Sequence, residues 1–137
     1  AAKFSPITTA LLKDHGIFDF ATDYYYSHEL NDWSEFVFTE TDFQEFLKFL
    51  KTNNFEYETE SEKEFAEALR KAEADKLDED ITESYNQLMI AIDRAKEKAL
   101  VNKKEEIITI ISDEILKRYF YRDGMYNYHI KNSPEIK

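Results

Sequence analysis

Cysteine is absent from this chain of 137 residues, and glycine and proline occur only twice each. The lack of cysteine excludes disulfides, thiolate catalysis and cysteine-ligated zinc sites. Two glycines cannot supply the turns of a barrel or sandwich, or the glycine-rich loops that bind phosphates in nucleotide-binding folds. Because glycine and proline usually make up about 7% and 5% of a chain, their scarcity favours a mainly helical fold.

The sequence also has no long apolar run and fewer basic than acidic residues. The longest apolar run, from Leu88 to Ile92, has five residues, whereas a membrane helix needs about 20. The chain shows no signal peptide, and membrane insertion is not expected. Basic residues number 18 against 29 acidic ones, and residues 1–78 hold 18 of the acids and 8 of the bases. The net charge of −11 repels phosphate backbones, so nucleic acid is not an expected partner.

Aromatic side chains are abundant, with 11 Phe, 9 Tyr and 1 Trp among the 137 residues. They bring the hydrophobic fraction to 42%, which is enough for a folded core. The length corresponds to one domain. We therefore expect a single helical domain over residues 1–137.

Capping signals and apolar spacing predict a bundle of helices. Ser5 and Pro6 start the first, which ends with Gly16 in the left-handed conformation. A second follows over 17–28. Two further helices begin with the capping boxes Thr41-x-x-Gln44 and Ser61-x-x-Glu64, the first ending at Asn53 and Asn54 and the second near residue 76. The segments 35–39 and 55–59 are too short to fix as strands; if they pair, they form a very short two-stranded β element.

The C-terminal half carries the longest expected helix. Apolar residues alternate spacings of four and three from Ile81 to Ala99, a heptad seam that requires a partner helix. The seam falters at 102–106 and resumes from Ile107 to Tyr119, so this region is one long helix with a bend or two helices, ending before Gly124. Another helical turn is expected over 125–131, and Ser133 and Pro134 look like the start of a further helix.

Reactive constellations are not evident in the sequence. His15, His28 and His129 are far apart and form no helical ligand pair, so no metal site is predicted. Ser27 and His28 are neighbours, but adjacent residues on a helix point about 100° apart, which argues against a serine triad. Carboxylate pairs such as Asp19 with Asp23 would need a displaced pKa, which a sequence cannot reveal. We therefore predict no catalytic residue, no cofactor and no metal.

Several segments together resemble the C-terminal region of bacterial carboxy-terminal processing proteases, also called tail-specific proteases. The resemblance covers most of the chain and rests on four motifs in order: Leu11-Leu12, GIFDFA from Gly16 to Ala21, FEYETESE over 55–62, and E-I-x-x-R-Y-F-Y-x-x-G from Glu114 to Gly124. It implies a parent in the periplasm or cell envelope, with a PDZ domain and a protease core that uses a serine nucleophile and a lysine base. Both catalytic residues would lie outside this chain, which would be a fragment from the C-terminal part of that protease.

That resemblance implies a helical accessory domain that is catalytically inert by itself. It would pack against the protease core and PDZ domain of the same parent, help to assemble subunits, or recruit protein substrate. The aromatic excess beyond what one helix stripe can bury supplies the expected docking residues, Phe18, Tyr25, Tyr119 and Tyr121. The competing hypothesis is a free-standing helical adaptor that binds a partner helix through the 81–99 seam.

Overall fold

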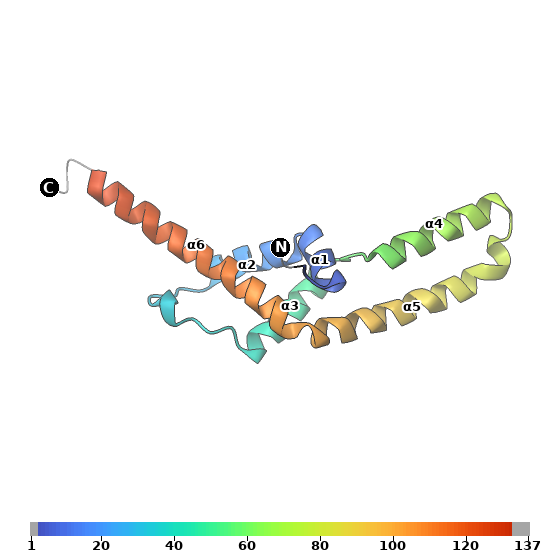
Figure 1. Ribbon diagram of the computed structural model, residues 1–137, viewed down its shortest axis with the longest axis horizontal. Coiled ribbons are helices and arrows are strands. Elements are labelled where there is room, and N and C mark those ends of the chain that lie inside the picture. The colour runs from blue at the N-terminus through green and yellow to red at the C-terminus, as the bar shows by residue number, and fades with distance from the viewer. Residues whose placement is uncertain (1–2, 133–137) are drawn as a thin grey trace. The chain divides into compact units, whose positions relative to one another are not determined.

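The structure, a computed structural model, is mainly helical, as the sequence predicts (Figure 1). It describes residues 3–132, with side chains as far as Gly124. This part of the chain contains one short 3-10 helix and six α-helices: α1 (Pro6–Lys13), α2 (Gly16–Ser27), η1 (Trp33–Glu35), α3 (Glu40–Thr52), α4 (Glu60–Ala74), α5 (Asp78–Asn102) and α6 (Lys104–Asn132). The predicted helix start at Ser133 and Pro134 lies outside the described residues.

The expected β element does not form. Over residues 3–132 the backbone contains no strand, and the segments 36–39 and 55–59 connect helices without pairing. Phe38 serves the core instead, since it is buried and packs edge-on against Phe20 with ring centroids 6.2 Å apart, whereas Val37 is exposed. The alternation of apolar and acidic residues in such short segments therefore reflects which side chains face the core.

The chain divides into two compact units, and each has buried apolar residues of its own. The first consists of Ala1–Asp14 with Glu56–Ile107, and the second of His15–Phe55 with Ile108–Lys137. The expectation of a single helical domain over 1–137 stays a prediction.

In the first unit, α4 and α5 form an antiparallel hairpin and α1 packs against α5 (Figure 1). Ser5 caps α1 as predicted, since its hydroxyl accepts from the backbone N–H of Thr8. The Glu106 carboxylate in turn accepts from both hydroxyls, at 2.8 Å from Ser5 Oγ and 2.7 Å from Thr8 Oγ1. These hydrogen bonds hold the pKa of Glu106 below its usual value and tie the start of α1 to the start of α6.

A buried lysine fastens α5 to the start of α4. Lys96 Nζ lies 2.9 Å from Glu62 Oε1 and 2.8 Å from the carbonyl of Glu56, and it sits over the ring of Tyr57. Burial raises the pKa of Glu62, but hydrogen bonds from Thr59 and Lys96 outweigh burial, and the net pKa is lowered. The ammonium group is fully paired, which is what allows a charge to be buried here.

In the second unit, aromatic residues of α2 pack against α3. Phe20 is at the centre, with its ring centroid 5.2 Å from that of Phe46 and 5.4 Å from that of Phe49. The apolar residues of α2 at helical spacing face the core: Ile17, Phe20, Ala21 and Tyr24 are buried and Tyr25 is half-buried. On α6, the predicted stripe of Ile111, Ile115 and Tyr119 is fully buried as well.

Both predicted capping boxes are displaced by two residues. The box at α3 joins Thr39 and Asp42 rather than Thr41 and Gln44, and the box at α4 joins Thr59 and Glu62 rather than Ser61 and Glu64. At each site two overlapping patterns compete, and the earlier one adds half a turn of hydrogen-bonded helix. Gln44 instead hydrogen-bonds to Glu40 within the helix.

The glycines do not end helices as expected. His15, not Gly16, takes the left-handed conformation after α1 with a φ of 63°, and Gly16 is the buried first residue of α2. α6 continues past Gly124 to Asn132, which confirms helix over 125–131 and corrects the predicted end. Helix interiors tolerate one glycine at a cost of about 1 kcal/mol, which the rest of a long helix can offset.

The break near 102–106 is resolved in favour of two helices, because α5 ends at Asn102 and α6 begins at Lys104. Asn53 and Asn54 close α3 as predicted. Asn54 has a φ of 56°, and the N–H of Phe55 donates to the carbonyl of Leu50, the pattern of a Schellman cap. Across the described helices, no segment is both long and apolar enough to cross a membrane.

Candidate functional site

In the second unit, an open groove of about 800 Å³ lies between α2 and α6. Its walls are aromatic and basic, with a single carboxylate. The lining residues are Phe18, Thr22, Tyr25 and Tyr26 from α2 and Glu114, Lys117, Arg118, Tyr121 and Arg122 from α6. The helical spacing of both sets places them on facing sides of the two helices.

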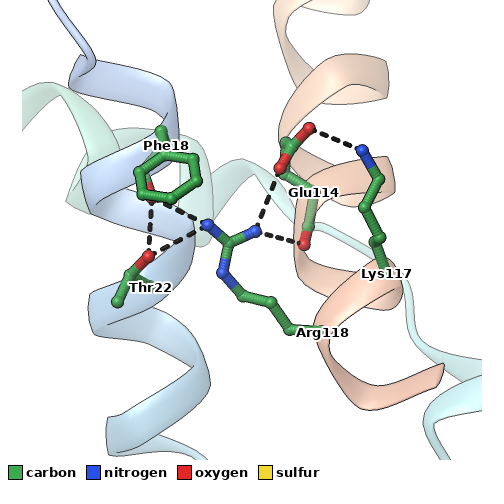
Figure 2. A network of polar contacts seen from close by, with 5 residues as sticks. All are labelled: Phe18, Thr22, Glu114, Lys117 and Arg118. Carbon is green, nitrogen blue, oxygen red and sulfur yellow. Dashed lines mark hydrogen bonds and ion pairs between the residues drawn. The ribbon is translucent and has the colours of Figure 1, made fainter. Parts of the chain in front are cut away.

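Arg118 joins the two walls of the groove (Figure 2). Its Nη1 donates to the carbonyl of Glu114 at 2.6 Å and to Glu114 Oε2 at 3.0 Å, both within α6. Its Nη2 donates across to α2, at 2.9 Å to Thr22 Oγ1 and 3.3 Å to the carbonyl of Phe18. The guanidinium also lies over the Phe18 ring, 4.6 Å from the centroid. A planar group with five donors suits this bridging position better than a lysine would.

The charge of the groove is opposite to that of the whole chain. Lys117, Arg118 and Arg122 supply three positive charges against one lining carboxylate, Glu114, and Arg122 also pairs with Asp123 beside the lining at 2.9 Å. Burial raises the pKa of Glu114, but hydrogen bonds from Lys117 and Arg118 outweigh it and lower the net pKa. The groove is therefore a locally basic surface on an acidic protein.

Three of the four predicted docking residues line this one groove. Phe18 is 54% exposed, Tyr121 is 68% exposed and Tyr25 is half-buried. Their distance in sequence gave no hint that they would meet, since Phe18 and Tyr25 lie on α2 and Tyr121 on α6. Their docking role itself remains a prediction.

Tyr119 differs from the other three because it is 1% exposed and has no surface to offer a partner. Its hydroxyl donates to the carbonyl of His28 at 2.6 Å, and its ring packs edge-on against Tyr25 at 4.8 Å. Burial raises the pKa of its hydroxyl. Tyr119 thus supports Tyr25 from the core side of the groove.

Sequence reasoning missed Tyr26 and Arg118 as groove residues. The three consecutive tyrosines of α2 divide between core and surface: Tyr24 is buried, Tyr25 is half-buried and Tyr26 is exposed. Arg118 was visible only as part of a motif, since nothing local to α6 shows that Thr22 lies within reach.

Ser27 and His28 do meet, contrary to the expectation from helical spacing. Ser27 Oγ lies 2.9 Å from His28 Nδ1, because His28 is the extended C-cap of α2 and escapes the helical repeat. The same Nδ1 lies 3.0 Å from the carbonyl of Tyr24, which can only accept. A proton on Nδ1 satisfies this contact, and in that tautomer Nδ1 cannot act as a base toward Ser27. Among the described residues there is also no cluster of three or more His, Cys, Asp or Glu side chains able to hold a metal ion.

Basic aromatic grooves occur in many kinds of helical binding domain, and comparison with known proteins identifies the family of this chain. No curated protein and no solved structure matches the chain. One family model covers nearly all of it, from residue 7 to residue 137. By that match, the chain belongs to the family of C-terminal helical domains of probable PDZ-proteases.

Proposed function

We propose that this chain is the non-catalytic accessory domain of a carboxy-terminal processing serine protease of the bacterial cell envelope, and that its α2–α6 groove docks the protease body. The observation that carries the proposal is the aromatic rim around Arg118. Phe18 and Tyr121 expose more than half of their surface there. Large exposed aromatic rings beside an arginine are typical of interface hot spots.

The fixed geometry of the groove supports docking over catalysis. Arg118 is held by both helices, so the surrounding rings are presented on a preorganised surface. The lining holds one carboxylate, and that carboxylate is paired with two cations, which suits no acid–base role. Membership in the PDZ-protease family supports a protease core and PDZ domain of the same parent as the occupant.

The test uses the full-length parent protease carrying Phe18→Ala and Tyr121→Ala together. We expect a loss of turnover of about tenfold or more, because hot-spot truncations typically cost at least 1–2 kcal/mol of interface free energy. Val37→Ala is the matched control, since Val37 is an exposed apolar residue outside the groove. Unchanged assembly on size-exclusion chromatography together with unchanged turnover in the double variant would refute the groove assignment.

A second measurement separates accessory from catalytic roles. The purified 137-residue chain is expected to leave fluorogenic peptide substrates intact, because its described residues hold no nucleophile with an activating base. Cleavage that persists after repurification would contradict the accessory role. The free-standing adaptor hypothesis is distinguished by the reading frame around this segment, which would then encode no PDZ domain or protease core.

A further inference from the structure

α4 and α5 pair as an antiparallel hairpin (Figure 1), and in its distal part the apolar side chains of α5 are incompletely buried. Between Ala72 and Lys96, both buried, no residue of the hairpin is buried. The seam side chains of α5 are half-buried at Tyr85, Leu88 and Ile92, and Ile81 is 37% exposed. A fully packed bundle would bury the whole seam.

The geometry of that seam calls for a helix. Alternating spacings of four and three form a narrow stripe that winds slowly around α5 and matches the side of another helix. In the hairpin, α4 covers the seam of α5 from one side only. A third helix lying along the hairpin would cover its other side. The seam therefore selects an elongated, amphipathic partner rather than a compact ligand.

The charge around the seam determines which charge the partner helix must carry. Residues 73–93 hold seven acidic side chains and one basic one, a net charge of −6. Within the described part of the chain, Asp75, Glu79, Asp80 and Glu83 take part in no ion pair. A second copy of this chain would bring the same negative charge to the interface, and like charges facing each other disfavour it.

We propose that the distal α4–α5 hairpin binds a basic amphipathic helix of a partner protein. Apolar residues of that helix cover Ile81, Leu88 and Ile92, and its flanking lysines or arginines face the carboxylates of residues 73–93. This surface lies in the first unit and is acidic, whereas the α2–α6 groove lies in the second and is basic. The two proposals therefore stand independently.

The binding test uses the 137-residue chain and a fluorescent synthetic peptide of about 18 residues that carries leucine on one helical face and lysine on the other. A peptide with glutamate in place of lysine, and a lysine peptide with the same composition in scrambled order, are the matched controls. Fluorescence anisotropy is expected to show at least tenfold tighter binding of the amphipathic lysine peptide than of either control. Its affinity should fall as NaCl rises from about 50 to about 300 mM, because salt screens exposed charges.

Variants of the hairpin locate the site. The triple change Glu79→Gln, Asp80→Asn and Glu83→Gln removes exposed charges and is expected to weaken binding about tenfold. Two of these residues lie in the first turn of α5, so retained helicity is verified by circular dichroism. Leu88→Ser on the seam should weaken it by a similar factor. Ile90→Ser is the control, because Ile90 is 54% exposed and lies about 170° around α5 from the seam.

Four results would overturn the proposal. One is equal binding of the scrambled peptide, which would reduce the effect to unspecific charge attraction. Another is an equal loss for Ile90→Ser and Leu88→Ser, with the fold of both verified by circular dichroism. The third is sedimentation evidence that Leu88→Ser dissolves a dimer of the chain itself, which would make a second copy the occupant. Unchanged binding by the triple charge variant would equally refute the basic partner.

Discussion

Arg118 shows how one side chain can fix the relation of two helices within a compact unit. It is 16% exposed, it donates to both α2 and α6, and its guanidinium covers Phe18 (Figure 2). Removing it would leave the Thr22 hydroxyl and the Glu114 carboxylate short of a partner. The cost of such truncation comes mainly from the polar groups left behind.

We predict that Arg118→Ala lowers the free energy of unfolding by about 2 kcal/mol, measured by urea denaturation followed by circular dichroism. Lys117→Ala is the matched control, because Lys117 also pairs with Glu114 but is 69% exposed. An exposed ion pair contributes less than about 1 kcal/mol, so the control should change stability little. Equal effects of the two changes would mean that the bridge to α2 adds nothing.

At the scale of single residues, exposure followed only partly from the sequence. The heptad-like spacing correctly placed Ile111, Ile115 and Tyr119 on one buried stripe. That same spacing implies that Tyr119 belongs to the core and not to a docking surface. The aromatic excess was a sound reason to expect an exposed cluster, and Phe18, Tyr25 and Tyr121 do gather in the groove.

Capping decides where elements begin, and α3 offers a sharp test. Thr39→Ala is predicted to cost about 1 kcal/mol of unfolding free energy, because the Thr39 hydroxyl accepts from the N–H of Asp42 in a complete capping box. Thr41→Ala, two residues on and also exposed, is the control and should cost less than half as much. A larger loss at Thr41, in thermal and urea unfolding alike, would restore the box first expected there.

The start of α1 depends on a carboxylate, so its stability should depend on pH. The pKa of Glu106 is lowered by hydrogen bonds from Thr8 and Ser5, so in the folded state it lies below the unfolded value near 4.5. Ionised Glu106 therefore adds stability above pH 4.5, and this contribution is lost as the pH falls through the folded pKa.

We predict that unfolding free energy falls less steeply below about pH 5 in Glu106→Gln than in the original chain, measured by urea titrations at several pH values. The decline should be reduced and not abolished, because the pKa values of Glu62, Glu114 and Asp123 are lowered too. Glu64→Gln, at an exposed position of α4, serves as control. If the unfolding free energy of the Glu106 variant and that of the original chain fell in parallel with pH, the hydrogen bonds to Glu106 would add no pH-dependent stability.

Over the whole molecule, a net charge of −11 opposes compaction. Raising NaCl from about 10 to about 200 mM shortens the Debye length from about 30 Å to under 10 Å and should screen this self-repulsion. We predict a rise of a few degrees in the thermal midpoint, measured by differential scanning calorimetry, with KCl giving the same shift. A falling midpoint would mean that ion pairs such as Lys96 with Glu62 outweigh the repulsion.

The amino-acid sequence by itself determined the helical class and the approximate place of the helices, because helix formation depends on local spacing, caps and the scarcity of glycine and proline. It left open whether α5 and α6 are one helix or two, and it misplaced both capping boxes by two residues. It also determined the absence of cysteine chemistry and the acidic character. Only the tertiary structure decided that Arg118 reaches Thr22, that Lys96 is buried with Glu62, and that Phe18 and Tyr121 share a groove. Each of these joins residues far apart in the chain, and the packing of helix faces, which no local pattern encodes, brings them together.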